Sequence, residues 1–203
     1  MRPEHLSEMQ MDALREVGGI GAGHAATALS QLVDRPISLD VPTIGLLPIG
    51  EVPHIFGGPE QLVAGVYCRL LGDIGGSILF VASRTASLAL LDLLRGRPLG
   101  TYKSFRPEEE SLFGHAAAIV VSAYLSAVAR LADLSLLPSS PAFALDMAGA
   151  ILEVAMLDLG TKASDALVVR TRFHDAEVSV DAVLLFLPDP DSLDVLLGRL
   201  GVV

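Results

Sequence analysis

The chain has 203 residues, of which 51% are hydrophobic and 19% are charged, and this balance excludes a wholly disordered protein. Its formal net charge at pH 7 is −10, with 24 acidic against 14 basic residues, which argues against nucleic acid as a partner because phosphate binding requires surplus Lys and Arg. The single cysteine excludes an internal disulfide, and no spacing of His and Cys indicates a metal site.

The first predicted element is a long helix. Ser7 followed by Gln10 forms a capping-box pattern, and apolar residues then recur at three- and four-residue steps as far as about Val33. Pro36 is expected to close the helix. Residues 1–16 carry charges throughout and have no apolar core of a signal peptide, so we expect a cytoplasmic protein.

Four glycines, at positions 18, 19, 21 and 23, lie in the middle of this helix, although each costs about 1 kcal/mol relative to alanine. Tight packing against a second helix, or close approach of a partner's backbone, would explain them. The segment 21–26 also fits the G-x-G-x-x-A pattern of dinucleotide-binding proteins, with Asp40 where a ribose-binding acid is sought. That interpretation is disfavoured, because the motif must follow a β-strand and here it follows a helical pattern.

Strands and a short helix are predicted for the rest of the first half. The strand candidates are 37–41 with 44–47, then 62–70 and 77–82. The glycine-rich segment 72–76 is typical of a hairpin connection between the last two. An amphipathic segment follows over 85–94, and residues 96–105 join the halves.

The second half is predicted to begin with a helix from about Pro107 to Leu131, whose acidic first turn suits the positive end of the helix dipole. Residues 111–129 carry no Asp, Glu, Lys or Arg and are long enough to span a membrane. Their alanine-rich composition favours a buried helix instead, so we expect no membrane partner. Strands are predicted over 150–159, 166–173 and 178–187, a turn over 174–176, and an amphipathic segment over 191–200.

The two halves resemble each other. At a shift of 99 residues Leu32 matches Leu131 and Asp34 matches Asp133, and at a shift of 105 the segment 78–96 matches 183–201. We therefore predict one domain over 1–203, built from two repeats at about 7–97 and 106–201. The expected fold is an α/β domain with pseudo-twofold layers, in which two long helices pack on β-sheet from both halves.

A polar stripe is expected along one face of the first helix. Asp12, Glu16 and Gly19 are spaced i, i+4 and i+7, which places them within about 60° on the helix. An ordinary solvated face and a docking patch for a basic pocket both fit this stripe. The corresponding positions of the second helix, at the 99-residue shift, hold Ser111, His115 and Ala118.

Both stripes resemble the motif of the CheC family of chemotaxis phosphatases, which has CheX and FliY as relatives. That motif is Asp or Ser, then x3-E-x2-N-x22-P, and it often occurs twice. The first copy here is Asp12-x3-Glu16-x2-Gly19-x22-Pro42, and the second is Ser111-x3-His115-x2-Ala118-x22-Pro141. The segments 16–28 and 72–77 also resemble the family, and the whole match covers about residues 7–201.

The resemblance implies hydrolysis of the aspartyl phosphate on a CheY-like response regulator. The regulator would hold its own Mg²⁺, so the chain needs no cofactor of its own and contributes mainly geometry. In the family, the Asn amide places a water in line and the Glu anchors the partner through a lysine. Here Gly19 and Ala118 stand at the two Asn positions, and His115 replaces the second Glu.

We therefore expect a CheC-like protein that binds a phosphorylated regulator and has weak or no phosphatase activity. The alternative is a non-catalytic module that binds a CheD-like receptor deamidase or takes a place in the flagellar switch, with 85–94 and 191–200 as candidate interfaces. Glu16 and His115 are the candidate catalytic residues, and the candidate partner-binding residues are Asp12, Gly19, Ser111 and Ala118.

Overall fold

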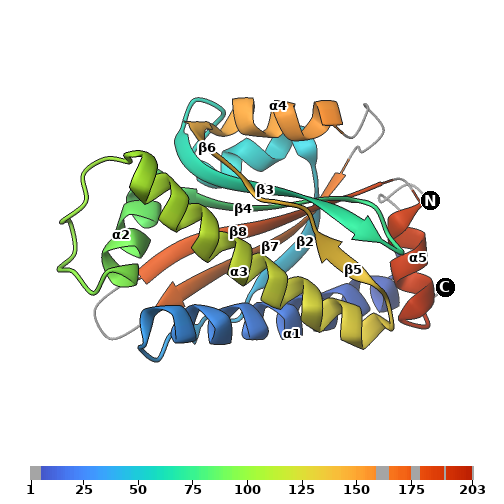
Figure 1. The fold of residues 1–203 in the computed structure, drawn as a ribbon. Coiled ribbons are helices and arrows are strands. Elements are labelled where there is room, and N and C mark those ends of the chain that lie inside the picture. Colours follow the sequence, from blue (N-terminus) through green and yellow to red (C-terminus); the bar gives the residue numbers. More distant parts are fainter. Residues whose placement is uncertain (1–5, 159–164, 175–178, 190, 203) are drawn as a thin grey trace.

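The computed structural model describes residues 6–158, 165–174, 179–189 and 191–202, and Figure 1 shows their arrangement. The first half contains α1 (Glu8–Val33), β1 (Ser38–Leu39), β2 (Thr43–Pro48), the 3-10 helix η2 (Ile49–Phe56), β3 (Leu62–Gly72), β4 (Gly76–Ser83) and α2 (Arg84–Leu94). The second half contains α3 (Pro107–Ala132), β5 (Leu136–Pro138), β6 (Ala142–Met147), α4 (Ala148–Asp158), β7 (Asp165–His174), β8 (Ser179–Pro188) and α5 (Ser192–Arg199).

The eight strands of the described residues form one antiparallel sheet with the order β1-β7-β8-β4-β3-β5. In addition β2 pairs with β7, and β6 pairs with β3. At the centre of the sheet β4 pairs with β8. The strands β3 and β7 flank this pair, and β5 and β1 follow at the two edges, so each strand of one half has a strand of the other half at the same distance from the centre. The mixed α/β fold is therefore as predicted, whereas the duplication and its boundaries stay predictions.

Helices cover both faces of the sheet, so the molecule has three layers (Figure 1). One core lies between the sheet and the helices α1, α2, α3 and α5, and it includes Phe80 and Phe113. The other lies between the opposite face and η2 with α4, and it includes Leu79 and Leu185. Neighbouring residues of the central strands alternate between the two cores, because successive side chains of a strand point to opposite faces. This burial on both sides explains why β4 is apolar almost throughout.

The long helices begin and end close to where the sequence predicts. The hydroxyl of Ser7 accepts a hydrogen bond from the Gln10 N–H, and the Gln10 side chain accepts one from the Ser7 N–H, which completes the capping box of α1. Asp34 is the C-cap of α1 and Asp133 is the C-cap of α3, and both aspartates adopt the left-handed conformation with φ of 50°. The two C-cap aspartates are 99 residues apart, which is the shift at which the sequences of the two helices match.

By length and composition alone, α3 could cross a membrane. It is the one helix among the described residues that is long and apolar enough. Its most apolar 18-residue window is 56% buried inside the protein. Phe113, Val121 and Leu125 are among the residues that it packs into the core. These contacts are those of a core helix, as the alanine-rich composition favours.

One strand prediction is wrong: 150–159 was expected to be a strand, but residues 148–158 form the helix α4. Ala148, Ile151, Leu152 and Ala155 are buried at helical spacing, whereas Glu153, Val154 and Leu157 are exposed. Residues 148–158 are so apolar that their sequence does not show the helical period of 3.6 residues. Residue 159 lies outside the described residues.

The sequence does not predict every element of the fold, and one predicted turn lies mostly outside the described residues. The strands β5 and β6 and the helix η2 have no clear counterpart among the expected elements. The connection at 72–76 is the predicted turn between β3 and β4. Most of the predicted turn at 174–176 lies outside the described residues.

The amphipathic segments expected over 85–94 and 191–200 form α2 and α5. Leu90 and Leu91 of α2 and Leu196 and Leu197 of α5 are buried in the main core. Their apolar faces are therefore used for internal packing.

Candidate functional site

The first polar stripe lies on the exposed side of α1. The carboxylate of Asp12 accepts a hydrogen bond from Arg15 at 2.8 Å, and the side chains of Asp12 and Arg15 are 71% and 57% exposed. Glu16 lies one turn further along and is also exposed. Among the described residues, no ion pair or hydrogen bond engages the Glu16 carboxylate. This side chain is therefore free to meet a partner.

The four glycines of α1 fall into two classes. A Cβ on Gly21 would lie 2.7 Å from two ring carbons of Tyr124 on α3, and a Cβ on Gly18 would lie 2.7 Å from the Cδ1 of Ile44. A Cβ on Gly19 or Gly23 would meet no atom within 4 Å. Close packing thus explains both Gly18, which lies against β2, and Gly21, which lies against α3, whereas Gly19 faces open space beside Glu16.

The second polar stripe lies on the exposed side of α3. The Oγ of Ser111 and the Nδ1 of His115 are 3.4 Å apart, and both side chains are exposed. A shallow cavity of about 320 Å³ adjoins them, and Pro141 and Phe143 also line it. Ala118 is half-buried one turn further along. The second motif therefore offers a hydroxyl and an imidazole, and it has neither the carboxylate nor the carboxamide of the family motif.

Within the described residues, the side-chain contacts of each stripe stay on its own helix, so the two stripes form separate sites. Asp12 bonds to Arg15 within α1, and Ser111 bonds to His115 within α3. Within residues 6–158, 165–174, 179–189 and 191–202, no group of three or more His, Cys, Asp or Glu side chains lies together as metal ligands would. The chemistry that either stripe can supply is that of a carboxylate or an imidazole on an exposed helix face.

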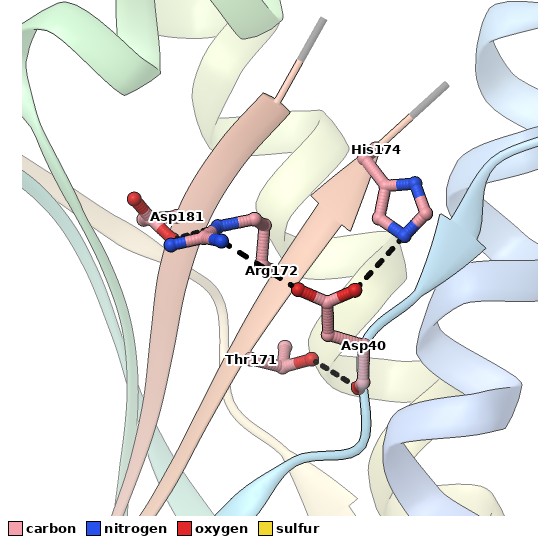
Figure 2. A network of polar contacts seen from close by, with 5 residues as sticks. All are labelled: Asp40, Thr171, Arg172, His174 and Asp181. Atoms are coloured by element: carbon pink, nitrogen blue, oxygen red, sulfur yellow. Dashed lines mark hydrogen bonds and ion pairs between the residues drawn. The ribbon is translucent and has the colours of Figure 1, made fainter. Parts of the chain in front are cut away.

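The dinucleotide-binding alternative fails on the structure. The segment 21–26 lies in the middle of α1, where the backbone N–H groups are bonded within the helix. Asp40, the acid considered for that role, instead takes part in a network of polar contacts on the sheet (Figure 2). Its carboxylate lies 3.0 Å from the Nε2 of His174 and 3.7 Å from the Nη1 of Arg172.

This network joins β7 and β8 to the segment between β1 and β2, and the sequence alone does not predict it. The Nε of Arg172 donates to Asp181 at 2.8 Å across the β7–β8 pair, and the hydroxyl of Thr171 donates to the backbone oxygen of Asp40. The hydrogen bond and the charge of Asp181 raise the pKa of Arg172. Arg172 and His174 stand two residues apart and so share a strand face, but only the sheet register reveals their partners.

The chain is similar to known proteins in both sequence and fold. The family model described as the CheC-like family matches residues 9–46, which include the first polar stripe. The CheY-P phosphatase CheC of Bacillus subtilis (strain 168) is 36% identical over 200 residues, which cover 97% of this chain and 96% of that relative. The flagellar motor switch phosphatase FliY of the same strain is 32% identical over 93 residues, 46% of this chain and about a quarter of that relative.

A similar solved structure is that of Thermotoga maritima FliY, determined by X-ray crystallography. It aligns with a TM-score of 0.77 at 16% identity, over 97% of this chain and 98% of that one. At this identity the likeness establishes the fold alone. The three-layer arrangement around the antiparallel sheet is thus shared with Thermotoga maritima FliY.

Proposed function

The chain belongs to the CheC-like family, and from that premise we propose that it binds a phosphorylated CheY-type response regulator with the α1 face, and that its phosphatase activity is weak or lost. The supporting relative is named as a CheY-P phosphatase and is similar over almost the whole chain. The observation that carries the proposal is the pairing of an exposed Glu16 with the side-chain-free Gly19 one turn away. We expect the protein to act in the cytoplasm, where such regulators are found.

The chemistry depends on what each position supplies. Hydrolysis transfers the phosphoryl group from the regulator's aspartate to water, so the water must be held in line with the bond that breaks. The regulator would supply Mg²⁺ to neutralise the phosphoryl oxygens. Glu16 carries a charge that pairs with a lysine of the partner, with Asp12 beside it, but Gly19 has no group that can hold the water. The proposed result is docking without efficient hydrolysis.

The Gly19→Asn variant tests the proposal. The decay of a ³²P-labelled regulator is measured alone, with the natural chain, and with the variant. The natural chain is expected to leave the decay close to the spontaneous rate, and Gly19→Asn is expected to accelerate it by at least about tenfold, because one positioned catalytic group typically contributes that much or more. Gly23→Asn is the matched control, since its side chain would also meet open space on α1.

Binding is measured separately from hydrolysis. Glu16→Gln is expected to weaken binding of the regulator about tenfold, or about 1.4 kcal/mol, by removing the charge that meets the partner's lysine. A natural chain that already hydrolyses the phosphate rapidly would contradict the loss of activity. A Gly19→Asn variant that binds normally but stays inactive would contradict the geometry of the site.

The second stripe has a proposed role as well. His115 can orient water through its Nε2, because its Nδ1 lies next to the Ser111 hydroxyl, and Ala118 marks the contact surface beside it. His115→Ala is therefore expected to remove whatever residual hydrolysis the natural chain has. If that residual rate is unchanged in His115→Ala but lost in Glu16→Gln, the α1 stripe alone is responsible.

The second candidate function is a non-catalytic module of the flagellar switch or a binding partner of a CheD-like deamidase. The similarity to FliY of Bacillus subtilis, which is named as a flagellar motor switch phosphatase, favours the switch assignment. A regulator-binding experiment discriminates the two functions. A chain that binds no phosphorylated regulator but binds purified switch proteins supports the second.

A further inference from the structure

A cavity lined by basic residues lies between the end of α2 and the start of α3. It has a volume of about 570 Å³, and Arg95, Arg97, Lys103 and Arg106 line it. We call it the basic cavity. These four residues fall within residues 95–106, a segment without Asp or Glu in a chain of net charge −10. The cavity is thus a local exception to the acidic character of the protein.

The charges of the basic cavity are not neutralised by partners. In the described part of the chain, none of the four basic side chains forms an ion pair. Arg97 places its guanidinium 5.2 Å from the centre of the Tyr102 ring, a contact that leaves its N–H groups available. Glu108 and Glu109 also line the cavity, and the Oε2 of Glu109 is engaged by the Arg106 N–H at 2.9 Å. Four positive charges therefore face two negative ones.

A buried carboxylate holds the loop that carries these residues. Asp92 on α2 is 0% exposed, and its two oxygens accept hydrogen bonds from three backbone N–H groups of the loop. The donors and their distances are Gly100 at 2.6 Å, Thr101 at 3.2 Å and Tyr102 at 3.0 Å. The backbone oxygen of Asp92 also accepts from the Arg97 N–H at 2.8 Å.

A second contact fixes the far side of the same loop. Arg84, at the start of α2, donates from its Nη2 to the backbone oxygen of Lys103 at 2.5 Å. The backbone of the loop is therefore tied to α2 at several points, and this fixes where its basic residues begin. Such preorganisation reduces the entropy that a ligand must overcome when it binds.

We propose that the basic cavity binds a phosphorylated small molecule of about nucleotide size. Guanidinium groups match the geometry of phosphate oxygens through paired N–H donors, and a nearby ammonium adds charge. The volume lies within the range of small-molecule sites, so it suits a compact ligand better than an extended acidic peptide. The inference goes beyond the proposed function, because none of its residues belongs to the α1 stripe.

Calorimetric titration of the full chain with ADP, and separately with inorganic pyrophosphate, tests the proposal. We expect saturable binding with a dissociation constant below about 1 mM, which weakens as NaCl rises from about 50 to 300 mM. The double variant Arg95→Gln with Lys103→Gln is expected to bind at least about tenfold more weakly. The matched control, Arg130→Gln with Arg199→Gln, removes two exposed charges elsewhere and should bind as the natural chain does.

Three outcomes would overturn the proposal. The first is that neither ADP nor pyrophosphate binds saturably. The second is that both double variants lose the same affinity, which would indicate an adventitious ion only. The third is that a polyglutamate peptide binds more tightly than ADP. The regulator-binding experiment is repeated on the cavity variant, where unchanged binding is expected. That second readout separates a failure of this proposal from a failure of the proposed function.

Discussion

Alanine substitutions along α1 test whether its glycines are there for packing or for access. Gly21→Ala would place a methyl group 2.7 Å from the Cδ2 and Cε2 of Tyr124, whose ring is buried in the main core. Gly19→Ala makes the same chemical change two residues away and meets nothing within 4 Å. The two variants therefore share the helix and the change in helix propensity, and they differ only in the space available.

The expected magnitudes follow from two opposing terms. Replacing glycine by alanine inside a helix stabilises it by about 1 kcal/mol. Forcing a methyl group into a packed core costs about 1–3 kcal/mol. Gly19→Ala should therefore raise the free energy of unfolding by up to about 1 kcal/mol, and Gly21→Ala should lower it by about 0–2 kcal/mol. Gly18→Ala should fall between them, because the Cδ1 of Ile44 is the flexible end of a side chain and can move aside.

Urea denaturation of the three variants measures these differences as shifts of the midpoint at constant slope. A gap of about 1–3 kcal/mol between Gly19→Ala and Gly21→Ala is expected. In a Tyr124→Ala background, which removes the ring, Gly21→Ala should recover the stabilisation seen at Gly19. Equal stabilisation of Gly19→Ala and Gly21→Ala in the natural background would refute the packing argument, and with it the view that Gly19 borders open space whereas Gly21 does not.

Three further predictions concern buried and exposed charges. Asp92→Ala should lower the free energy of unfolding by about 2–4 kcal/mol in urea denaturation, since it leaves three loop N–H groups without their acceptor, and a loss no larger than that of Asp92→Asn would contradict this. Burial raises the pKa of Cys68 and of Tyr124, so the folded state keeps protons that the unfolded chain releases above about pH 9. Stability should therefore be complete below about pH 8 and fall at higher pH, less steeply in Tyr124→Phe, and an equal fall in both proteins would exclude Tyr124 as a cause. Asp40→Asn should lower the denaturation midpoint slightly at low salt and not at about 1 M NaCl, because its partners are half-exposed and screened, and a salt-independent loss would indicate another role.

The long helices could be predicted from the sequence because their signals are local. The capping box of α1 involves residues three apart, and the apolar period of each helix repeats within one or two turns. The same local rule placed Asp12 and Glu16 on an exposed face, as the structure has them. The missing carboxamide at Gly19 was likewise visible from the motif alone.

The helix α4 and the strands β5 and β6 could not be predicted in this way. A short apolar run such as 148–158 satisfies both a buried strand and a buried helix, and the choice depends on the space left on the sheet. The strands β5 and β6 are short, and β6 is mostly exposed, so little hydrophobic pattern marks them. Their pairing with β3 is what makes them strands.

The sequence by itself determined the two long helices, the polar stripes and the altered motif, because each depends on residues within a few turns of one another. Only the tertiary structure separated Gly21, which packs against Tyr124, from Gly19, which is open, although both have the same local sequence character. Only the tertiary structure also shows that the loop after α2 binds Asp92 through its backbone N–H groups, and that four basic residues line one cavity. The physical reason is that steric contact and charge clustering depend on distances in space, which local periodicity does not encode.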